Sequence, residues 1–204
     1  MRVKIVKDRT FSADELDGVL AGQEYRNCVF DKLPLKRMKL EECRFLACSF
    51  VRADLTGARL NGSEFRGSNL SNARIDGCNL FAVKFEECKL LGLDFSGGVT
   101  LTAVKLARCN LDYARFRGLT LAKMEFAGCS FVETDLSLTD LEKASFVDCD
   151  LTRTDLSGAH FYQTDVRGSN LTGWNLRKYD LSGLVISPGQ FHYLAEEIGI
   201  LILE

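Results

Sequence analysis

The stretch ADLTGARLNGSEFRGSNLSNARIDGCNL, residues 53–80, places an apolar residue at every fifth position. The series runs from Tyr25 to Phe95 and, after a slip of one residue, from Leu101 to Ile186. Of its 33 members 18 are Leu and 11 are Phe, so the period is a property of the whole chain. Five residues of α-helix advance by about 500°, and an odd step along a strand alternates faces, so neither regular element explains the spacing. The sequence therefore predicts a chain that turns after every five residues.

A second column, of mostly small residues, lies two positions before each apolar centre and contains all eight cysteines. Cys109, Cys129 and Cys149 are 20 residues apart, which indicates that four five-residue sides make one coil. The spacing contains no zinc-binding pattern, and thiols on successive coils point the same way, which is poor disulfide geometry. We predict eight free, buried thiols that fill the core, with no metal and no cofactor. The one-residue slip at Gly97 and Gly98 is interpreted as a bulge or short loop.

The pattern resembles that of the pentapeptide-repeat family, which is roughly A(D/N)LXX. The residues that carry the resemblance include ADLTG at 53–57, SNLSN at 68–72, CNLDY at 109–113 and TDLSG at 154–158. The resemblance covers about residues 25–186 and implies an all-β fold, a right-handed quadrilateral β-helix. About eight coils, at about 4.8 Å per coil, would give a rod roughly 40 Å long.

The two ends of the chain lie outside the repeat, and the sequence predicts three segments. Residues 1–24 form an N-terminal cap segment, residues 25–186 the β-helix, and residues 187–204 a short C-terminal helix and tail. Cover at both ends is required because an open solenoid exposes unpaired backbone. Ser187 and Pro188 are typical of a helix N-cap and first turn.

The C-terminal segment carries more apolar surface than a closed coil can bury. We therefore predict a two-fold homodimer through the C-terminal ends. Its predicted interface consists of Trp174, Pro188, Phe191, Tyr193, Leu194, Ile198, Ile200 and Ile202.

The ending LSGLVISPGQFHYLAEEIGILILE, residues 181–204, narrows the resemblance to the Qnr family of quinolone-resistance proteins. This resemblance implies a dimeric DNA mimic that binds the type II topoisomerases DNA gyrase and topoisomerase IV and confers quinolone resistance. Several Qnr members carry loops that project from the coils, whereas here the only interruption is the extra residue near Gly97 and Gly98. The chain is therefore more similar to loop-less relatives, among them the mycobacterial fluoroquinolone-resistance protein.

The distribution of charge bears on this function independently. A net charge of −2 over the chain argues against an overall basic nucleic-acid binder. Between residues 125 and 165, nine acidic residues accompany only Lys143 and Arg153, a net charge of −7. We predict that these nine form a DNA-mimicking surface: Glu125, Glu133, Asp135, Asp140, Glu142, Asp148, Asp150, Asp155 and Asp165. The alternative is a generic interaction scaffold with an unrelated protein partner, because Asp or Asn before the central residue belongs to the repeat pattern itself.

Catalysis finds no support in the sequence. His160 and His192 have no nucleophile placed near them by a motif, and the carboxylates are expected to face solvent. Glycines recur as turn residues and form no phosphate-binding motif. We predict a protein that is not an enzyme and that binds neither nucleic acid nor a membrane. The charged N-terminus and the lack of an 18-residue apolar run indicate a cytoplasmic location.

Overall fold

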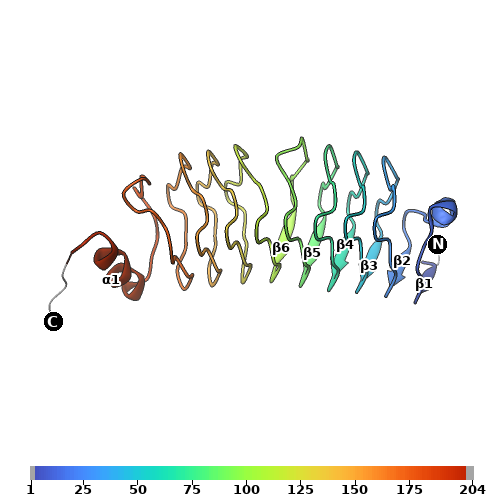
Figure 1. Ribbon diagram of the computed structural model, residues 1–204, viewed down its shortest axis with the longest axis horizontal. Helices are drawn as coiled ribbons and strands as arrows, with labels where there is room; N and C mark the ends of the chain where they lie inside the picture. The colour runs from blue at the N-terminus through green and yellow to red at the C-terminus, as the bar shows by residue number, and fades with distance from the viewer. Residues whose placement is uncertain (1–2, 201–204) are drawn as a thin grey trace.

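The computed structural model describes residues 3–200, which form an elongated parallel β-solenoid followed by one helix (Figure 1). Six short strands, one per coil, form a single parallel sheet in sequence order. They are β1 (Ile5–Lys7), β2 (Glu24–Arg26), β3 (Arg44–Leu46), β4 (Glu64–Arg66), β5 (Lys84–Glu86) and β6 (Lys105–Ala107). Isolated parallel bridges continue the pairing as far as Asp165 and Val185. The predicted solenoid fold is confirmed.

Each coil has four sides, which we number by the apolar centres that they carry. Side 1 carries Tyr25 on β2, and sides 2, 3 and 4 carry Phe30, Leu35 and Leu40. The same four sides recur in each later coil, because the strands pair with residues 20 positions further on.

The register changes by one residue at two places. Phe85 on β5 lies opposite Leu106 on β6, a step of 21, so the extra residue is absorbed and the solenoid continues. Gly98 adopts a φ of 75° there, a left-handed conformation that suits glycine. Val6 on β1 lies opposite Tyr25, a step of 19. Part of the segment predicted to be an N-terminal cap thus pairs with the sheet, and it is followed by a 3-10 helix, η1 (Ala13–Gly18).

The apolar centres form ladders of rings along the axis. On side 1, Tyr25, Phe45, Phe65 and Phe85 stack with centroid distances of 5.2, 4.7 and 5.0 Å. Neighbouring sides meet edge to face, as Phe45 and Phe50 do at 5.0 Å. Offset stacks and edge-to-face pairs are the favoured arrangements of aromatic rings. The core combines both: rings stack along each side and meet edge to face between neighbouring sides.

The column of small residues is polar for a structural reason. Cys48 Sγ donates to the carbonyl oxygen of Tyr25 at 3.3 Å, and Thr134 Oγ1 donates to that of Leu111 at 2.8 Å. In both cases the acceptor is a central residue one coil earlier. All eight cysteines are buried, and burial raises the pKa of the Cys48 thiol to about 12. That thiol is therefore protonated and able to donate at neutral pH.

Asp and Asn before the centre also have a structural role. Asp54 Oδ1 accepts from the backbone nitrogen of Thr56 at 3.1 Å, and Asn69 Oδ1 accepts from that of Ser71 at 3.0 Å. This side-chain turn satisfies a backbone donor that faces solvent at the corner of the coil. The carboxylate and the amide do this equally, and Arg44 and Lys84 stand at the same position in other coils, so the fold leaves the charge there free to vary.

Candidate functional site

The nine acidic residues between 125 and 165 encircle the rod, and we call them the acidic belt. Glu125 and Asp165 lie on side 1 and Asp150 on side 2. Asp135 and Asp155 pair with each other on side 3. The remaining members lie on side 4 or at corners of the coils: Asp140, Glu142, Glu133 and Asp148. The structure thus spreads these residues over two turns of the solenoid, with Asp165 at the start of the next coil, and does not gather them on one side.

Part of the belt is neutralised by neighbours. Glu133 pairs with Arg153 at 2.5 Å, and Glu142 pairs with Lys143 at 2.8 Å. Asp165 receives the Arg167 guanidinium at 2.6 Å. Asp140 Oδ1 lies 3.4 Å from His160 Nδ1. Within residues 3–200, five members make no ion pair: Glu125, Asp135, Asp148, Asp150 and Asp155.

In three of these five carboxylates, one oxygen accepts a hydrogen bond from the chain's own backbone. Oδ1 of Asp135, Asp150 and Asp155 accepts from the backbone nitrogen two residues later, at 2.9, 3.0 and 3.0 Å. Hydrogen bonds from the Ser157 hydroxyl and backbone lower the pKa of Asp155, so it is ionised at neutral pH. In each case Oδ2 makes no hydrogen bond within residues 3–200 and is available to a partner's basic group.

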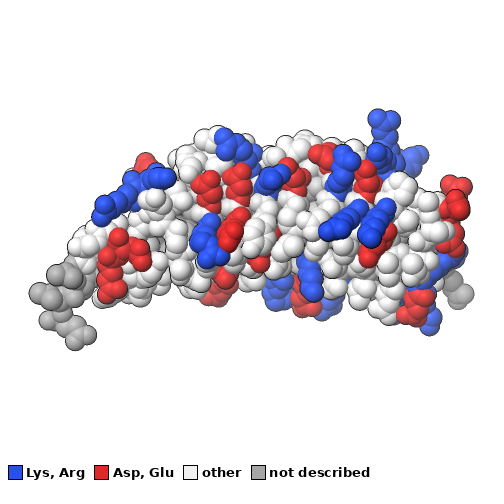
Figure 2. Space-filling model, viewed as in Figure 1, with Lys and Arg blue, Asp and Glu red and all other residues white. Residues whose placement is uncertain are grey.

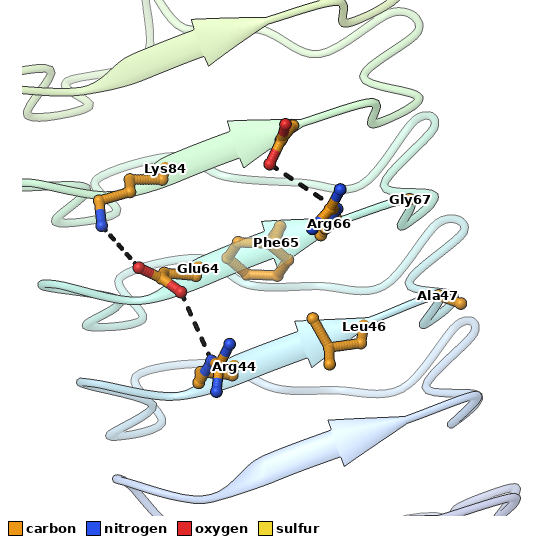
Figure 3. A pocket seen from close by; sticks show the side chains of 9 residues that line it. Arg44, Leu46, Ala47, Glu64, Phe65, Arg66, Gly67 and Lys84 are labelled. Atoms are coloured by element: carbon orange, nitrogen blue, oxygen red, sulfur yellow. Dashed lines mark hydrogen bonds and ion pairs between the residues drawn. The ribbon is translucent and has the colours of Figure 1, made fainter.

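In the N-terminal half, acidic and basic side chains alternate and form ion pairs with one another. Arg44 lies between two carboxylates on side 1, with Nη1 3.0 Å from Glu24 and Nε 3.5 Å from Glu64. Lys84 Nζ pairs with Glu64 at 2.6 Å, which extends the ladder to the next coil (Figure 3). A shallow hollow of about 540 Å³ runs beside this ladder, and each charged side chain that lines it takes part in an ion pair. Figure 2 shows the same interleaving of basic and acidic side chains over this part of the rod.

Helix α1 (Pro188–Glu197) covers the C-terminal end of the solenoid. Ser187 caps it, and Gln190 Nε2 donates to the carbonyl oxygens of Val166 and Ser169 at 2.6 and 2.8 Å. These carbonyls belong to the last coil, so the helix satisfies part of the edge that an open solenoid leaves unpaired.

The residues predicted for a dimer interface differ in how far they are exposed. Trp174 and Leu194 are buried against the chain's own last coil, and Trp174 Nε1 donates to the Leu151 carbonyl at 2.9 Å. Phe191, Ile198 and Ile200 are 55%, 42% and 51% exposed. Pro188 is exposed, Tyr193 is half-buried, and Ile202 lies outside the described residues.

The two histidines are solvent-facing. His160 lies beside Asp140 on side 4, and His192 Nδ1 is 3.0 Å from the Pro188 carbonyl. Across residues 3–200, no cluster of three or more His, Cys, Asp or Glu side chains is placed to hold a metal ion. None of the helices in that range is long and apolar enough to cross a membrane.

A family model of the pentapeptide repeat region matches residues 22–95 and 99–181, and the break between the two matches falls on the extra residue. The chain belongs to the pentapeptide-repeat family. Its fold is similar to that of a trypsin-treated form of QnrB1, a plasmid-mediated fluoroquinolone resistance protein. The TM-score is 0.83 at 20% identity, covering 99% of this chain and 98% of that one.

Full-length QnrB1 gives a TM-score of 0.71 at 21% identity, covering 97% of this chain and 98% of that one. At this level of identity the likeness shows the fold. No curated protein matches the sequence.

Proposed function

We propose that this protein binds a type II topoisomerase, DNA gyrase or topoisomerase IV, as a mimic of duplex DNA and thereby confers quinolone resistance in the cytoplasm. It acts by binding, without catalysis. The observation that carries the proposal is the charge density of the acidic belt. Residues 125–165, which contain the belt, advance by two coils, about 10 Å at the spacing of stacked strands, and hold a net charge of −7, about one charge per 1.4 Å. Duplex DNA presents one charge per about 1.7 Å of axis.

The similarity in fold to a fluoroquinolone resistance protein supports the same proposal. Free carboxylate oxygens on a rigid rod would attract the basic side chains that line a DNA-binding channel, with an association rate that falls as salt rises. Along side 1 of the N-terminal half the acidic side chains are held in ion pairs with basic ones, so the belt is where such an enzyme would make its electrostatic contact.

We further propose that two rods join through their C-terminal ends. Phe191, Ile198 and Ile200 supply an exposed apolar surface beyond helix α1, and a two-fold contact would cover it. Replacing Phe191 and Ile198 by Glu should give monomers in analytical ultracentrifugation while leaving the buried Leu194 in place. A wild-type protein that sediments as a monomer at micromolar concentration would remove this part of the proposal.

The test of DNA mimicry is to neutralise Asp135, Asp140, Asp150 and Asp155 to Asn. Asn makes the same turn hydrogen bond at Asn69 and Asn79, so the coil should be preserved. Each exposed contact contributes about 0.2 to 1 kcal/mol, so single variants should be nearly silent. The quadruple variant should bind gyrase at least about tenfold more weakly, since the contacts act in parallel. Binding is measured by competition with linear DNA and by inhibition of supercoiling.

Side 3 offers a matched control. Asp54 and Asp94 precede their centres on the same side as Asp135 and Asp155 but lie in the N-terminal half. The variant Asp54→Asn/Asp94→Asn should bind gyrase as wild type does, whereas Asp135→Asn/Asp155→Asn should bind more weakly. If the quadruple variant retains full affinity, or wild type does not bind gyrase even at low salt, the proposal is wrong. A generic scaffold for an unrelated protein then takes its place, because the acids have a sufficient role in the turns.

A further inference from the structure

The core of the rod opens to solvent immediately beyond the extra residue. Between residues 40 and 155, the half-buried apolar side chains at inward positions are Val99, Leu101, Leu119 and Met124. Three of the four occupy the column that elsewhere holds small residues such as Cys78. Val83 and Leu93 occupy the same column and are buried, whereas Val99, Leu119 and Met124, which follow the extra residue, are only half-buried.

The exposed side chains line a continuous groove. Two hollows, of about 330 and 550 Å³, share Leu101, Ala103 and Met124 as lining. The larger is floored by Val104 and Leu106. We call this depression the slip groove, after the change of register beside it.

The surroundings of the slip groove differ in charge from the acidic belt next to it. Along side 4, the outward positions from Asn79 to Ala122 carry no charged side chain. Lys105 and Lys123 line the groove and make no ion pair with any of residues 3–200. Glu125 stands at the same rim, so the lining has a net positive charge.

We propose that the slip groove is a second contact for the partner that binds the acidic belt. Its occupant is a segment of that partner with apolar side chains beside a carboxylate. The apolar side chains would displace water from Leu101 and Met124, and the carboxylate would pair with Lys105 and Lys123. This inference rests on the proposed function. The apolar part of this contact depends on shape and burial, which salt weakens little.

The first test removes the apolar lining without disturbing the coil. Thr139 occupies the position of Leu119 one coil later, and Thr164 occupies that of Met124 two coils later; both are buried there. The variant Leu119→Thr/Met124→Thr should therefore fold and should bind gyrase about tenfold more weakly. Met38→Thr is the matched control, because Met38 is a half-buried residue of the same column in the N-terminal half. Its affinity should stay within twofold of wild type.

The second test reverses the charge of the rim. Lys105→Glu/Lys123→Glu should weaken binding at least tenfold, whereas Lys89→Glu, at an exposed position on side 2, should have little effect. Ala122→Glu places a carboxylate on the charge-free wall, where the next coil carries Glu142 naturally, and should also weaken binding. If all groove variants bind as wild type while the Asn variants of the belt do not, the groove inference fails and the proposed function stands.

A probe that needs no topoisomerase tests the groove alone. Anilinonaphthalene sulfonate joins an aromatic group to an anion, which is the chemistry inferred for the occupant. Wild type and Met38→Thr should enhance its fluorescence, and both Leu119→Thr/Met124→Thr and Lys105→Glu/Lys123→Glu should lose most of that enhancement. Equal fluorescence in all four proteins would overturn the inference whether or not gyrase binds.

Discussion

The two halves of the rod, residues 25–95 and 101–186, share one core and differ in their outer surface. Along the first half, and from Glu24 just before it, Arg44, Glu64 and Lys84 continue a ladder on side 1 in which acid and base alternate. In the second, nine acids accompany two bases between residues 125 and 165. Inward side chains and turn acceptors follow the same rules in both. The repeat therefore fixes the coil and leaves the outward charges free to vary.

The largest effects should come from the core, and they should be equal in the two halves. Phe45 stacks between Tyr25 and Phe65, and Phe126 stacks on Phe146 at 4.8 Å. Replacing either by Ala should lower the free energy of unfolding by about 3 to 5 kcal/mol, from lost burial and the cavity left behind. Chemical denaturation measures both. A difference of more than about 2 kcal/mol between them would contradict a common core.

A smaller effect is expected from enlarging the thiol column. Cys48→Leu in the first half and Cys129→Leu in the second should each cost about 1 to 3 kcal/mol, because extra methylenes overfill a closed coil. Cys→Ala at the same positions should be milder, since it removes one sulfur atom with its weak hydrogen bond and forces nothing into the coil. Equal or greater loss with Ala than with Leu would show that the hydrogen bond outweighs the packing.

Removing an ion pair should reduce the free energy of unfolding by different amounts in the two halves. Arg44 pairs with Glu24, whose side chain is only 5% exposed, whereas Arg153 pairs with Glu133, which is 39% exposed. Arg44→Met should cost about 1.5 kcal/mol, since a hydrogen bond to a nearly buried charge is lost. Arg153→Met should cost at most about 0.5 kcal/mol, because solvent screens an exposed pair. Thermal unfolding at low and high salt distinguishes them. Equal costs would mean that the two halves hold their charges alike.

The smallest effect is on the response to acid. A hydrogen bond from Arg167 lowers the pKa of Asp165, and one from Lys84 lowers that of Glu64. A carboxyl group with a lowered folded pKa adds stability above its unfolded pKa, near 4, and loses it as pH falls through the folded value. The melting temperature should therefore be flat above about pH 5 and fall below about pH 4. Asp155→Asn, which keeps the turn bond, should reduce that fall slightly.

Most of the fold could be predicted because its rules are local. The five-residue period, the 20-residue coil and the helix after Ser187 all follow from the sequence pattern. Contacts between side chains of neighbouring coils could not be predicted from these local rules. That Glu133 is paired with Arg153, or that Trp174 closes its own coil, depends on contacts between residues about 20 positions apart.

The slip groove was missed, although the sequence carries its signal. Val99, Leu119 and Met124 stand where the column otherwise favours Cys, Ala, Ser or Thr. Their size alone does not say whether the coil expands to bury them or exposes them. Val83 and Leu93 are buried in the same inward column, so residue type alone does not predict which side chains are exposed.

Because each coil has four equivalent sides, a change in the number of five-residue sides rotates one part of the rod against the other. At Gly98 the chain already carries one residue more than a coil needs, and the columns realign afterwards. Inserting one whole pentapeptide there would keep every centre inside but move each later residue to the next side. The acidic belt and helix α1 would then turn by about 90° against the N-terminal half and advance only about 1 Å. The number of five-residue sides between the two ends thus sets the angle about the rod axis at which their surfaces face.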